Sequence, residues 1–437
     1  MFNLSNKSSF CSYRWDYLQV NIDQAQVRNC CQCPSIQISK EDSANPDFLL
    51  NNPYVLDRRK ELLRNFKHGD CKKCWKSEGH GAASMRSTSL SKHFFLKKNM
   101  LSNESSASWY NRINPKRSRS LRTLEISLGN LCNLKCHYCS PMFSSAWEKE
   151  HQSQRIGAQI VVSRIGEEEQ NQISKNTLLI LDQHLQTIEK IIFTGGEPLI
   201  NNRIYPILKQ ITEIGERHRR SNSPRRIELQ IVTNLSVPEK SLNRFLDLSK
   251  ELIKTFNINI SASIDNTGSR AEYIRTGLDW KLFEINVHKV LSSSSISWLS
   301  FHTTLSIFNT TSMIDVIKLS KELFDQYGKS VPLMDNMVTV PFHLSPLILT
   351  ADFSQYLQEC SDYVSREIHS RKPDFQAFID FTKSTAQAIR SEKSGESVHQ
   401  ARRRFVEWVS FYDKLRKTSF LDTFPEYKNF YDFCSSL

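Results

Sequence analysis

The sequence lacks any long hydrophobic run, which excludes several classes of protein. Its 437 residues contain no stretch of eighteen consecutive apolar residues, so we expect no membrane-spanning helix. The first fifteen residues, MFNLSNKSSFCSYRW, have no apolar segment of the kind that secretory signals carry. We find no internal repeat. We therefore expect a cytosolic protein that has no membrane partner.

A long basic tail is also missing, although the formal net charge is +12. Lysines and arginines spread over solvated helices explain such an excess, and the excess also suits an acidic partner. The sequence has no motif of interleaved aromatic and basic residues, which argues against nucleic acid as a partner. A zinc-stabilised nucleic-acid-binding protein is therefore kept only as the non-enzymatic alternative.

Cysteines are plentiful and unevenly distributed. Nine of the eleven lie in the first 139 residues, and in a cytosolic chain such clusters indicate metal ligands before disulfides. Cys360 and Cys434 stand alone in helical sequence, so we expect them to be small buried hydrophobic residues. The clustered cysteines are Cys11, Cys30, Cys31, Cys33, Cys71, Cys74, Cys132, Cys136 and Cys139.

The order of predicted elements divides the chain into four parts. Residues 1–90 are rich in cysteine, residues 91–120 read as a linker, residues 121–348 alternate strands with helices, and residues 349–437 are helical. This alternation predicts parallel βαβ units, an α/β fold and, with six units, a partial (β/α)6 barrel. The six predicted strands span 122–128, 190–194, 227–233, 256–265, 297–307 and 333–340.

The segment GNLCNLKCHYCS (129–140) directly follows the first of these strands. It places Cys132, Cys136 and Cys139 within eight residues, one thiolate short of a closed metal site. Three thiolates can hold three corners of a four-iron, four-sulfur cluster ([4Fe–4S]) and leave the fourth iron free for another ligand. The spacing also fits a zinc site with His137 as the fourth ligand.

The segment TGGEP (194–198) ends the second strand, at the same edge as the cysteine loop. Gly195 and Gly196 allow close approach of the backbone to a ligand, and Glu197 offers a carboxylate to an ammonium group. Pro198 suits the first turn of the next helix. A plain strand-to-helix turn would explain TGGEP alone, but both motifs at one edge favour an open cluster with an amino-acid ligand.

These two motifs resemble those of the radical S-adenosylmethionine (SAM) superfamily: CNLKCHYC has its CxxxCxxC spacing, and GGEP its glycine-rich motif. The resemblance spans residues 121–348. It implies an enzyme whose open iron binds the amino and carboxylate groups of SAM. It also implies that an electron from the reduced cluster cleaves SAM to a 5′-deoxyadenosyl radical, which abstracts hydrogen from the substrate.

The segment SASIDNTGSRAEYIRTGLDW (261–280) resembles the SIDG…R region of radical SAM enzymes that carry auxiliary clusters. There the serine and arginine contact SAM, which implies the same role for Ser263 and Arg275. Asn266 stands where the family has glycine. In the alternative interpretation, Asp265 caps a helix and Arg275 forms a surface ion pair.

The N-terminal cysteines resemble the Twitch module, a shortened relative of the SPASM domain that binds an auxiliary [4Fe–4S] cluster. Such modules usually follow the barrel, whereas here the likeness precedes it. The resemblance implies Cys11, Cys30, Cys71 and Cys74 as ligands of a second cluster that carries electrons, with Cys31 able to replace Cys30. A structural zinc site on the same four cysteines is the alternative.

Polar residues near the C-terminal ends of the strands are candidates for the substrate site. We predict that His302, on the fifth strand, and His343, after the sixth, position the substrate or its acid–base partner; a polar layer inside the barrel is the alternative. The spacing of Phe405, Trp408 and Tyr412 predicts the buried stripe of an amphipathic C-terminal helix.

The reaction stays open between two classes. The auxiliary-cluster resemblance and the basic charge favour modification of a ribosomally made peptide with an acidic leader. The alternative is a dehydrogenase or epimerase of a small molecule such as a sugar or alcohol. Either reaction requires an electron donor such as flavodoxin or ferredoxin.

Overall fold

The computed structural model describes residues 9–79, 84–87, 121–154, 162–220, 226–368, 372–391 and 396–437. The predicted linker at 91–120 lies outside these residues. Packing groups the chain into two units, which are described separately. The first comprises Met1–Gly129, Val161–Gly195 and Asn202–Leu229, and the second comprises Asn130–Ile160, Gly196–Asn201 and Gln230–Leu437. The domain boundaries predicted from composition remain a prediction.

The first unit combines the N-terminal region with two of the predicted barrel strands. Its strands are β1 (Tyr17–Asn21), β2 (Gln26–Arg28), β3 (Ile36–Gln37), β4 (Thr123–Ser127) and β6 (Lys190–Thr194). Its helices are α1 (Tyr13–Asp16), α2 (Lys40–Ser43), α3 (Pro46–Asn51), α4 (Pro53–Leu63), η1 (Gly69–Cys71), α5 (Lys72–Gly79), α10 (Glu167–His184) and α11 (Ile204–Arg220). Strand β7 (Ile227–Thr233) begins in this unit and continues into the second.

The strands of the first unit form a sheet in the order β6-β4-β1-β2-β3. Strand β4 is parallel both to β6 and to β1, with Leu124 opposite Ile191 and Leu18, while β2 is antiparallel to both β1 and β3. The N-terminal residues thus extend the sheet by a further parallel strand. This pairing was not predicted from the sequence.

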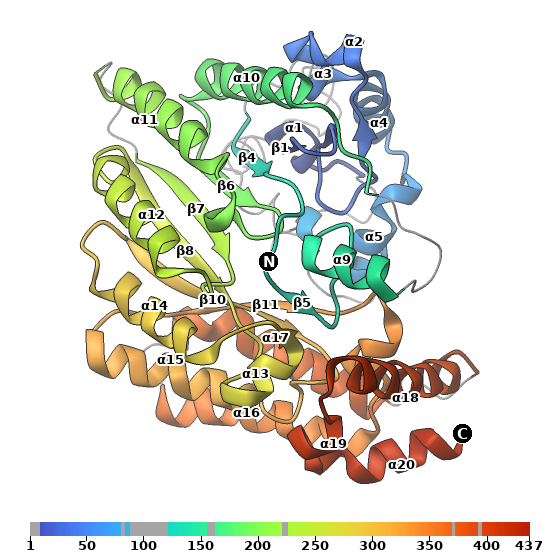
Figure 1. Ribbon diagram of the computed structural model, residues 1–437. Coiled ribbons are helices and arrows are strands. Elements are labelled where there is room, and N and C mark those ends of the chain that lie inside the picture. Colours follow the sequence, from blue (N-terminus) through green and yellow to red (C-terminus); the bar gives the residue numbers. More distant parts are fainter. Residues whose placement is uncertain are drawn as a thin grey trace, which may run out of the picture. The chain divides into compact units, whose positions relative to one another are not determined.

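Helix α10 shows why the sequence folds this way locally. It begins after Gly166 with three glutamates, which interact favourably with a helix N-terminus. Its buried residues Ile173, Thr177 and Leu181 recur every four positions and so form one apolar face. Helices α10 and α11 lie side by side (Figure 1).

The second unit contains the remaining predicted strands and the helical C-terminal region. Its strands are β5 (Lys135–Cys136), the end of β7, β8 (Phe256–Ser263), β9 (Arg275–Thr276), β10 (Trp298–Leu305) and β11 (Leu333–Met337). Its helices up to β11 are α9 (Ser145–Gln154), η2 (Pro198–Ile200), α12 (Glu239–Leu252), α13 (Gly268–Ile274), α14 (Trp280–Ser292) and α15 (Met313–Tyr327). The later helices are η3 (Phe342–Leu344), η4 (Pro346–Ile348), η5 (Ala351–Phe353), α16 (Ser354–Glu367), α17 (Lys372–Arg390), α18 (Glu396–Arg416), α19 (Phe420–Thr423), η7 (Pro425–Tyr427) and α20 (Lys428–Ser436).

Two pairings in the second unit position the candidate site. Strands β8 and β10 are parallel, with Ser263 opposite His302, and β10 is parallel to β11. The short strands β5 and β9 are antiparallel and place Cys136 opposite Arg275. All six predicted barrel strands are therefore present, and the predicted α/β fold with parallel strands and a helical C-terminal region is confirmed.

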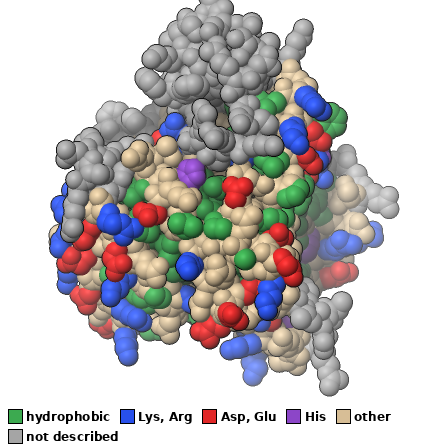
Figure 2. Space-filling view, turned by 90° about the horizontal axis from the view of Figure 1, so that it is seen from above, with side chains coloured by type: hydrophobic (Ala, Val, Ile, Leu, Met, Phe, Trp, Pro, Cys, Tyr) green, Lys and Arg blue, Asp and Glu red, His purple; other side chains and the backbone are tan. Residues whose placement is uncertain are grey.

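Two smaller expectations from the sequence are also met. Cys360 and Cys434 are buried, as are Phe405 and Tyr412 of the predicted stripe on α18, whereas Trp408 is half-buried. Within the described ranges, no helix is both long and apolar enough to cross a membrane. Figure 2 shows basic and acidic side chains interspersed on the described part of one face.

Candidate functional site

The loop that carries Cys132, Cys136 and Cys139 is held by the start of α9. The hydroxyl of Ser145 accepts a hydrogen bond from the amide of Cys132 at 3.1 Å, and the hydroxyl of Ser144 donates to the carbonyl of Leu134 at 2.6 Å. Cys136 belongs to a buried cluster on which the half-buried Cys132 and Cys139 pack. One short segment thus brings the three predicted ligands together.

The chemistry of the three thiols fits a metal cluster. The pKa values of Cys132 and Cys139 are both raised to about 12, mainly because the thiols are buried and also because the charge of Cys136 lies nearby. Deprotonated sulfurs packed this closely repel one another, and bound cations relieve that repulsion. Among the described residues, no three His, Cys, Asp or Glu side chains converge on a single metal-ion position. A [4Fe–4S] cluster instead binds each sulfur at a separate iron corner.

The TGGEP segment meets the cysteine loop at Leu131. The amide of Glu197 donates to the carbonyl of Leu131 at 2.7 Å. A Cβ atom on Gly196 would lie 2.3 Å from that carbonyl oxygen, so no other residue fits there without moving the backbone. Gly195 has φ +127°, a conformation that favours glycine. The two predicted motifs are therefore in direct contact.

Glu197 is only 1 % exposed, so its carboxylate is buried. It accepts hydrogen bonds from the amides of Asn234 (2.6 Å) and Leu199 (3.0 Å) and from the hydroxyl of Thr233 (2.8 Å). Burial raises its pKa to about 7, although these three donors oppose the rise. Asn234 and Thr233 thus connect the end of β7 to Glu197.

Asp265 and Arg275 form a buried ion pair, with 2.8 Å between Oδ2 and Nε. Asp265 also accepts hydrogen bonds from the hydroxyl of Tyr138 and from the amide of Thr304. Nη1 of Arg275 lies 3.9 Å from Sγ of Cys136. The alternative in which Asp265 caps a helix and Arg275 pairs at the surface is therefore wrong.

His137 is not placed as a fourth metal ligand. Its ring is buried and stacked on Tyr273, and its Nδ1 accepts a hydrogen bond from the indole N–H of Trp408 at 3.1 Å. Its Nε2 lies 3.4 Å from Nη1 of Arg416. Both ring nitrogens thus face α18, which contradicts the predicted zinc alternative with this histidine. The sequence alone did not indicate that Trp408, 271 positions away, would bond to the ring of His137.

The predicted polar residues on β8 and β10 lie on neighbouring strands. Ser263 and His302 are opposite each other and half-buried, so their side chains share one face of the sheet. Burial lowers the pKa of His302, and Arg275 adds to this effect. His343 lies elsewhere, in η3, with its ring centre 5.0 Å from that of Trp408. The two candidate histidines therefore have different surroundings.

In the first unit, the N-terminal cysteines gather beside a buried arginine. Nη2 of Arg14 lies 4.0 Å from Sγ of Cys71, and its Nη1 is buried with no hydrogen-bond partner among the described residues. Cys11 and Cys74 are close enough to Cys30 and Cys71 for their charges to interact. Asp70 already pairs with this guanidinium, 3.7 Å from Nη2, and the remaining donor at Nη1 suits a further anionic group at this position.

Cys33 also belongs to this group, although it was not among the ligands predicted from the sequence. It is buried, and its amide donates to the carbonyl of Cys30 at 3.1 Å. Interaction with the side chains of Cys31 and Cys33 holds the pKa of Cys30 well below that of a free thiol, and interaction with the side chain of Cys33 lowers the pKa of Cys71 to about 7. The spacing of Cys30 and Cys33 repeats the CxxC spacing of Cys71 and Cys74, a signal that could have identified it.

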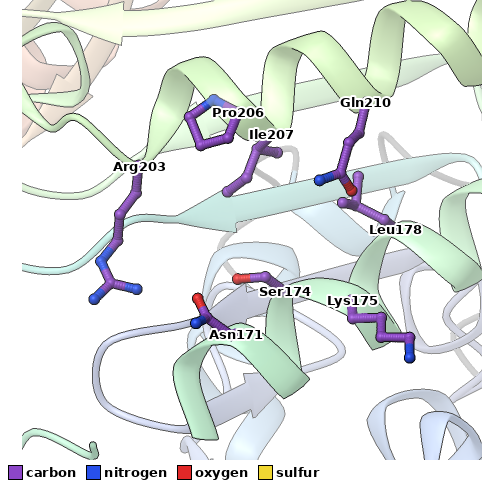
Figure 3. Close-up of a pocket in the computed structure, with 8 residues that line it drawn as sticks. All are labelled: Asn171, Ser174, Lys175, Leu178, Arg203, Pro206, Ile207 and Gln210. Atoms are coloured by element: carbon purple, nitrogen blue, oxygen red, sulfur yellow. The ribbon is translucent and has the colours of Figure 1, made fainter. Parts of the chain in front are cut away.

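Figure 3 shows a hollow of about 460 Å³ in the first unit, between α10 and α11. Asn171, Ser174 and Lys175 of α10 form one wall, with Arg203 ahead of α11. No cysteine, histidine or carboxylate lines it, so it offers no metal ligands of these kinds, and its ionisable groups are Lys175 and Arg203. We do not include it in the candidate site.

Comparison with known proteins agrees with the motifs. Residues 126–291 match the model of the radical SAM superfamily. A GTP 3′,8-cyclase of Alkaliphilus metalliredigens (strain QYMF) is 32 % identical over 97 residues, 22 % of this chain and 25 % of that protein. A GTP 3′,8-cyclase of Synechocystis sp. is 32 % identical over 96 residues, 22 % and 24 % of the two chains. The chain thus spans about a quarter of the length of these curated relatives.

Two solved structures are similar at low sequence identity. The enzyme anSMEcpe with bound AdoMet and Cp18Cys peptide is 16 % identical, with a TM-score of 0.39 over 57 % of this chain and 61 % of that one. Streptococcus suis SuiB bound to its precursor peptide SuiA is 14 % identical, with a TM-score of 0.38 over 81 % and 69 %. Neither resemblance identifies the reaction. The match over residues 126–291 includes the cysteine loop and TGGEP, so this part of the chain is a radical SAM domain.

Proposed function

We propose that Cys132, Cys136 and Cys139 hold a [4Fe–4S] cluster whose fourth iron takes SAM. The observation that carries this proposal is the contact of the two motifs at Leu131, where Gly196 leaves no room for a side chain. When bound, the reduced cluster would supply the electron that cleaves SAM between its sulfur and C5′, releasing methionine and providing the radical that abstracts a hydrogen atom from the substrate.

The residues of this chain would bind and orient SAM. Gly195 and Gly196 bring backbone without side chains to the loop. Glu197 is bonded to the end of β7. Its Oε2 accepts one hydrogen bond, from Asn234, which leaves a lone pair for the ammonium group. Ser263 and Arg275 are the proposed contacts of the SAM carboxylate or ribose. Arg275 also supplies a fixed positive charge beside Cys136, which favours an anionic cluster.

We also propose an auxiliary [4Fe–4S] cluster in the first unit, on Cys11, Cys30, Cys71 and Cys74. The buried Arg14 supports an anionic group there. Cys31 and Cys33 are competing ligands, and Cys33 is the stronger candidate because its thiol interacts with those of both Cys30 and Cys71. A cluster fully ligated by protein carries electrons and takes no substrate at iron, and this suits an oxidative modification.

The proposed substrate is a ribosomally made peptide, modified in the cytosol with electrons from a flavodoxin or ferredoxin. The net charge of +12 supports an acidic leader peptide. The alternative is a small-molecule reaction. The curated relatives are named as cyclases of a nucleotide, which is a small molecule. Within the segment that they share with this chain, their names therefore favour the alternative.

Electron paramagnetic resonance of the reduced, anaerobically reconstituted protein tests the proposal. We expect a [4Fe–4S] signal that changes on addition of SAM, because SAM binds the open iron. The matched control is Cys360→Ala, which removes a buried thiol outside the site and keeps the response. A cluster signal that SAM leaves unchanged would contradict the proposal.

A further inference from the structure

We infer that helix α18 positions the loop carrying Cys132, Cys136 and Cys139, with Trp408 and Arg416 as the positioning residues. This inference rests on the proposed cluster for its functional consequence, whereas the contacts themselves all lie within the second unit. Neither residue belongs to the two motifs that resemble the superfamily. From the sequence, Trp408 was predicted only as part of an apolar stripe.

The first contact joins Trp408 to His137, which lies directly after Cys136. The indole N–H donates to Nδ1 at 3.1 Å. His137 is also enclosed by the rings of Tyr273 at 5.0 Å and Tyr412 at 5.9 Å between centres. The amide of His137 in turn donates to the carbonyl of Ile274 at 2.9 Å. Trp408 therefore fixes the orientation of a side chain whose backbone lies between two of the proposed ligands.

The second contact joins Arg416 to both strands of the small β5–β9 sheet. Its Nη1 donates to the hydroxyl of Thr276, on β9, at 3.1 Å. Its Nη2 donates to Glu150 at 2.8 Å, and Glu150 accepts from the ammonium of Lys135, on β5, at 2.5 Å. Because β5 also carries Cys136 and β9 carries Arg275, one guanidinium sets the position of both.

The arginine is held firmly enough to act in this way. The side chain of Arg416 is 2 % exposed and that of Glu150 is 7 % exposed. The guanidinium lies over the rings of Trp147, at 4.7 Å, and of Tyr412, at 4.5 Å. A buried charge keeps its place only when its partners are in good geometry, so docking of α18 and ordering of the loop favour each other.

Trp147 closes the network. Its indole N–H donates to the carbonyl of Cys136 at 2.8 Å, while its ring packs on Arg416 and Trp408. Cys136 is thereby held by its carbonyl on one side and by the neighbouring His137 on the other. Loss of α18 contacts should increase the mobility of the cysteine loop and make its cluster easier to remove.

Hydrogen exchange of the full-length apoprotein tests the positioning, and the reconstituted protein tests its consequence. We compare Trp408→Phe, which keeps an aromatic ring but removes the indole N–H donor, with Arg416→Gln and its partial rescue Arg416→Lys. Lys414→Ala is the matched control, because Lys414 is an exposed cation on the same helix. We expect amides of residues 132–140 to exchange about tenfold faster in Trp408→Phe and Arg416→Gln. Lys414→Ala should match the wild type.

In the reconstituted protein, the signal that responds to SAM should decay faster under a chelator, and its midpoint potential should shift, in the same two variants. Unchanged exchange in both folded variants, or an equal change in Lys414→Ala, would overturn the inference. If Arg416→Gln fails to fold, Trp408→Phe decides the question. Faster exchange in a protein whose wild type takes up no cluster would support the positioning and refute the proposed function.

Discussion

The Nε atom of Arg275 and the Oδ2 atom of Asp265 lie 2.8 Å apart, and both side chains are buried. The same guanidinium reaches to 3.9 Å from Sγ of Cys136. A buried pair contributes little net stability when intact, but either member left alone is a charge without a partner. The pair therefore couples the fold of the second unit to the electrostatics beside the proposed cluster.

Replacing Arg275 by methionine should destabilise the protein strongly. The expected loss is about 3–5 kcal/mol in the free energy of unfolding, because Asp265 would remain buried and unpaired. Urea denaturation of the apoprotein measures it, and Asp265→Asn added to Arg275→Met should restore part of the loss. The control is Lys289→Ala, which removes a solvent-screened ion pair with the exposed Glu239 and should change the free energy of unfolding far less. Equal losses in Arg275→Met and Lys289→Ala would contradict this account.

Glu197 should make stability depend on pH between about 4.5 and 7. Burial raises its pKa from 4.5 to about 7, so in this window the folded protein keeps a proton that the unfolded chain has released. The free energy of unfolding should fall as pH rises through the window, by an amount on the order of 3 kcal/mol. Cys132 is the neighbouring titratable group, and its raised pKa places its own titration well above this range.

Unfolding curves at several pH values measure this effect. Glu197→Gln should remove that part of the pH dependence. Glu239→Gln, at an exposed position bonded to Lys289, should keep it. A pH dependence that persists unchanged in Glu197→Gln would show that another group is responsible.

Much of the fold was predictable from local sequence, because a strand or helix pattern depends on neighbouring residues. The six barrel strands and the contact between the cysteine loop and TGGEP follow from such patterns. The pairing of β1 with β4 joins residues more than 100 positions apart, as in Gln19 and Glu125, and periodicity carries no information on it. The same holds for Arg416 and Glu150, which are 266 positions apart.

One local prediction also failed for a physical reason. Pro198 was expected to lie in the first turn of the helix that follows TGGEP, but η2 ends at Ile200 and α11 begins only at Ile204. Glu197 caps η2 by accepting from the amide of Leu199, and its remaining hydrogen bonds tie it to β7. Tertiary hydrogen bonding thus overrides the helical pattern at this point.

The N-terminal cysteines predict two separable effects on iron content. Replacing Cys71 and Cys74 together by alanine should lower iron per protein while a SAM-responsive cluster remains. Product formation should fall more than SAM cleavage does, because this cluster is proposed to handle substrate electrons. Unchanged iron, with zinc found in the wild type, would refute the auxiliary cluster.

Cys33 and Cys31 provide a sharper comparison at the same site. Cys33→Ser should lower iron content more than Cys31→Ser does, since the thiol of Cys33 interacts with both Cys30 and Cys71, whereas Cys31 faces the sulfur of Met85 at 3.4 Å. Metal analysis of the two variants, prepared identically, measures the difference. Greater loss in Cys31→Ser would exclude Cys33 as the competing ligand.

The two candidate histidines should act on substrate rather than on SAM. We expect His302→Ala and His343→Ala to keep both clusters and SAM binding but to lose substrate turnover. Deuterium transfer from a labelled substrate into 5′-deoxyadenosine measures this step. His343 packs on Trp408, so a shift of the SAM-responsive signal in His343→Ala alone would assign it to the positioning network. Undiminished transfer in both variants would exclude either histidine from the substrate site.

Cleavage of SAM to 5′-deoxyadenosine is the measurement that tests the central claim most directly. The reduced, reconstituted protein should form 5′-deoxyadenosine. Cys136→Ala should abolish it because two thiolates cannot hold the open cluster. Cys360→Ala, a buried cysteine outside the site, should retain it. Full cleavage activity in Cys136→Ala, or none in the reconstituted wild type, would contradict the assignment of this loop as the site of radical chemistry.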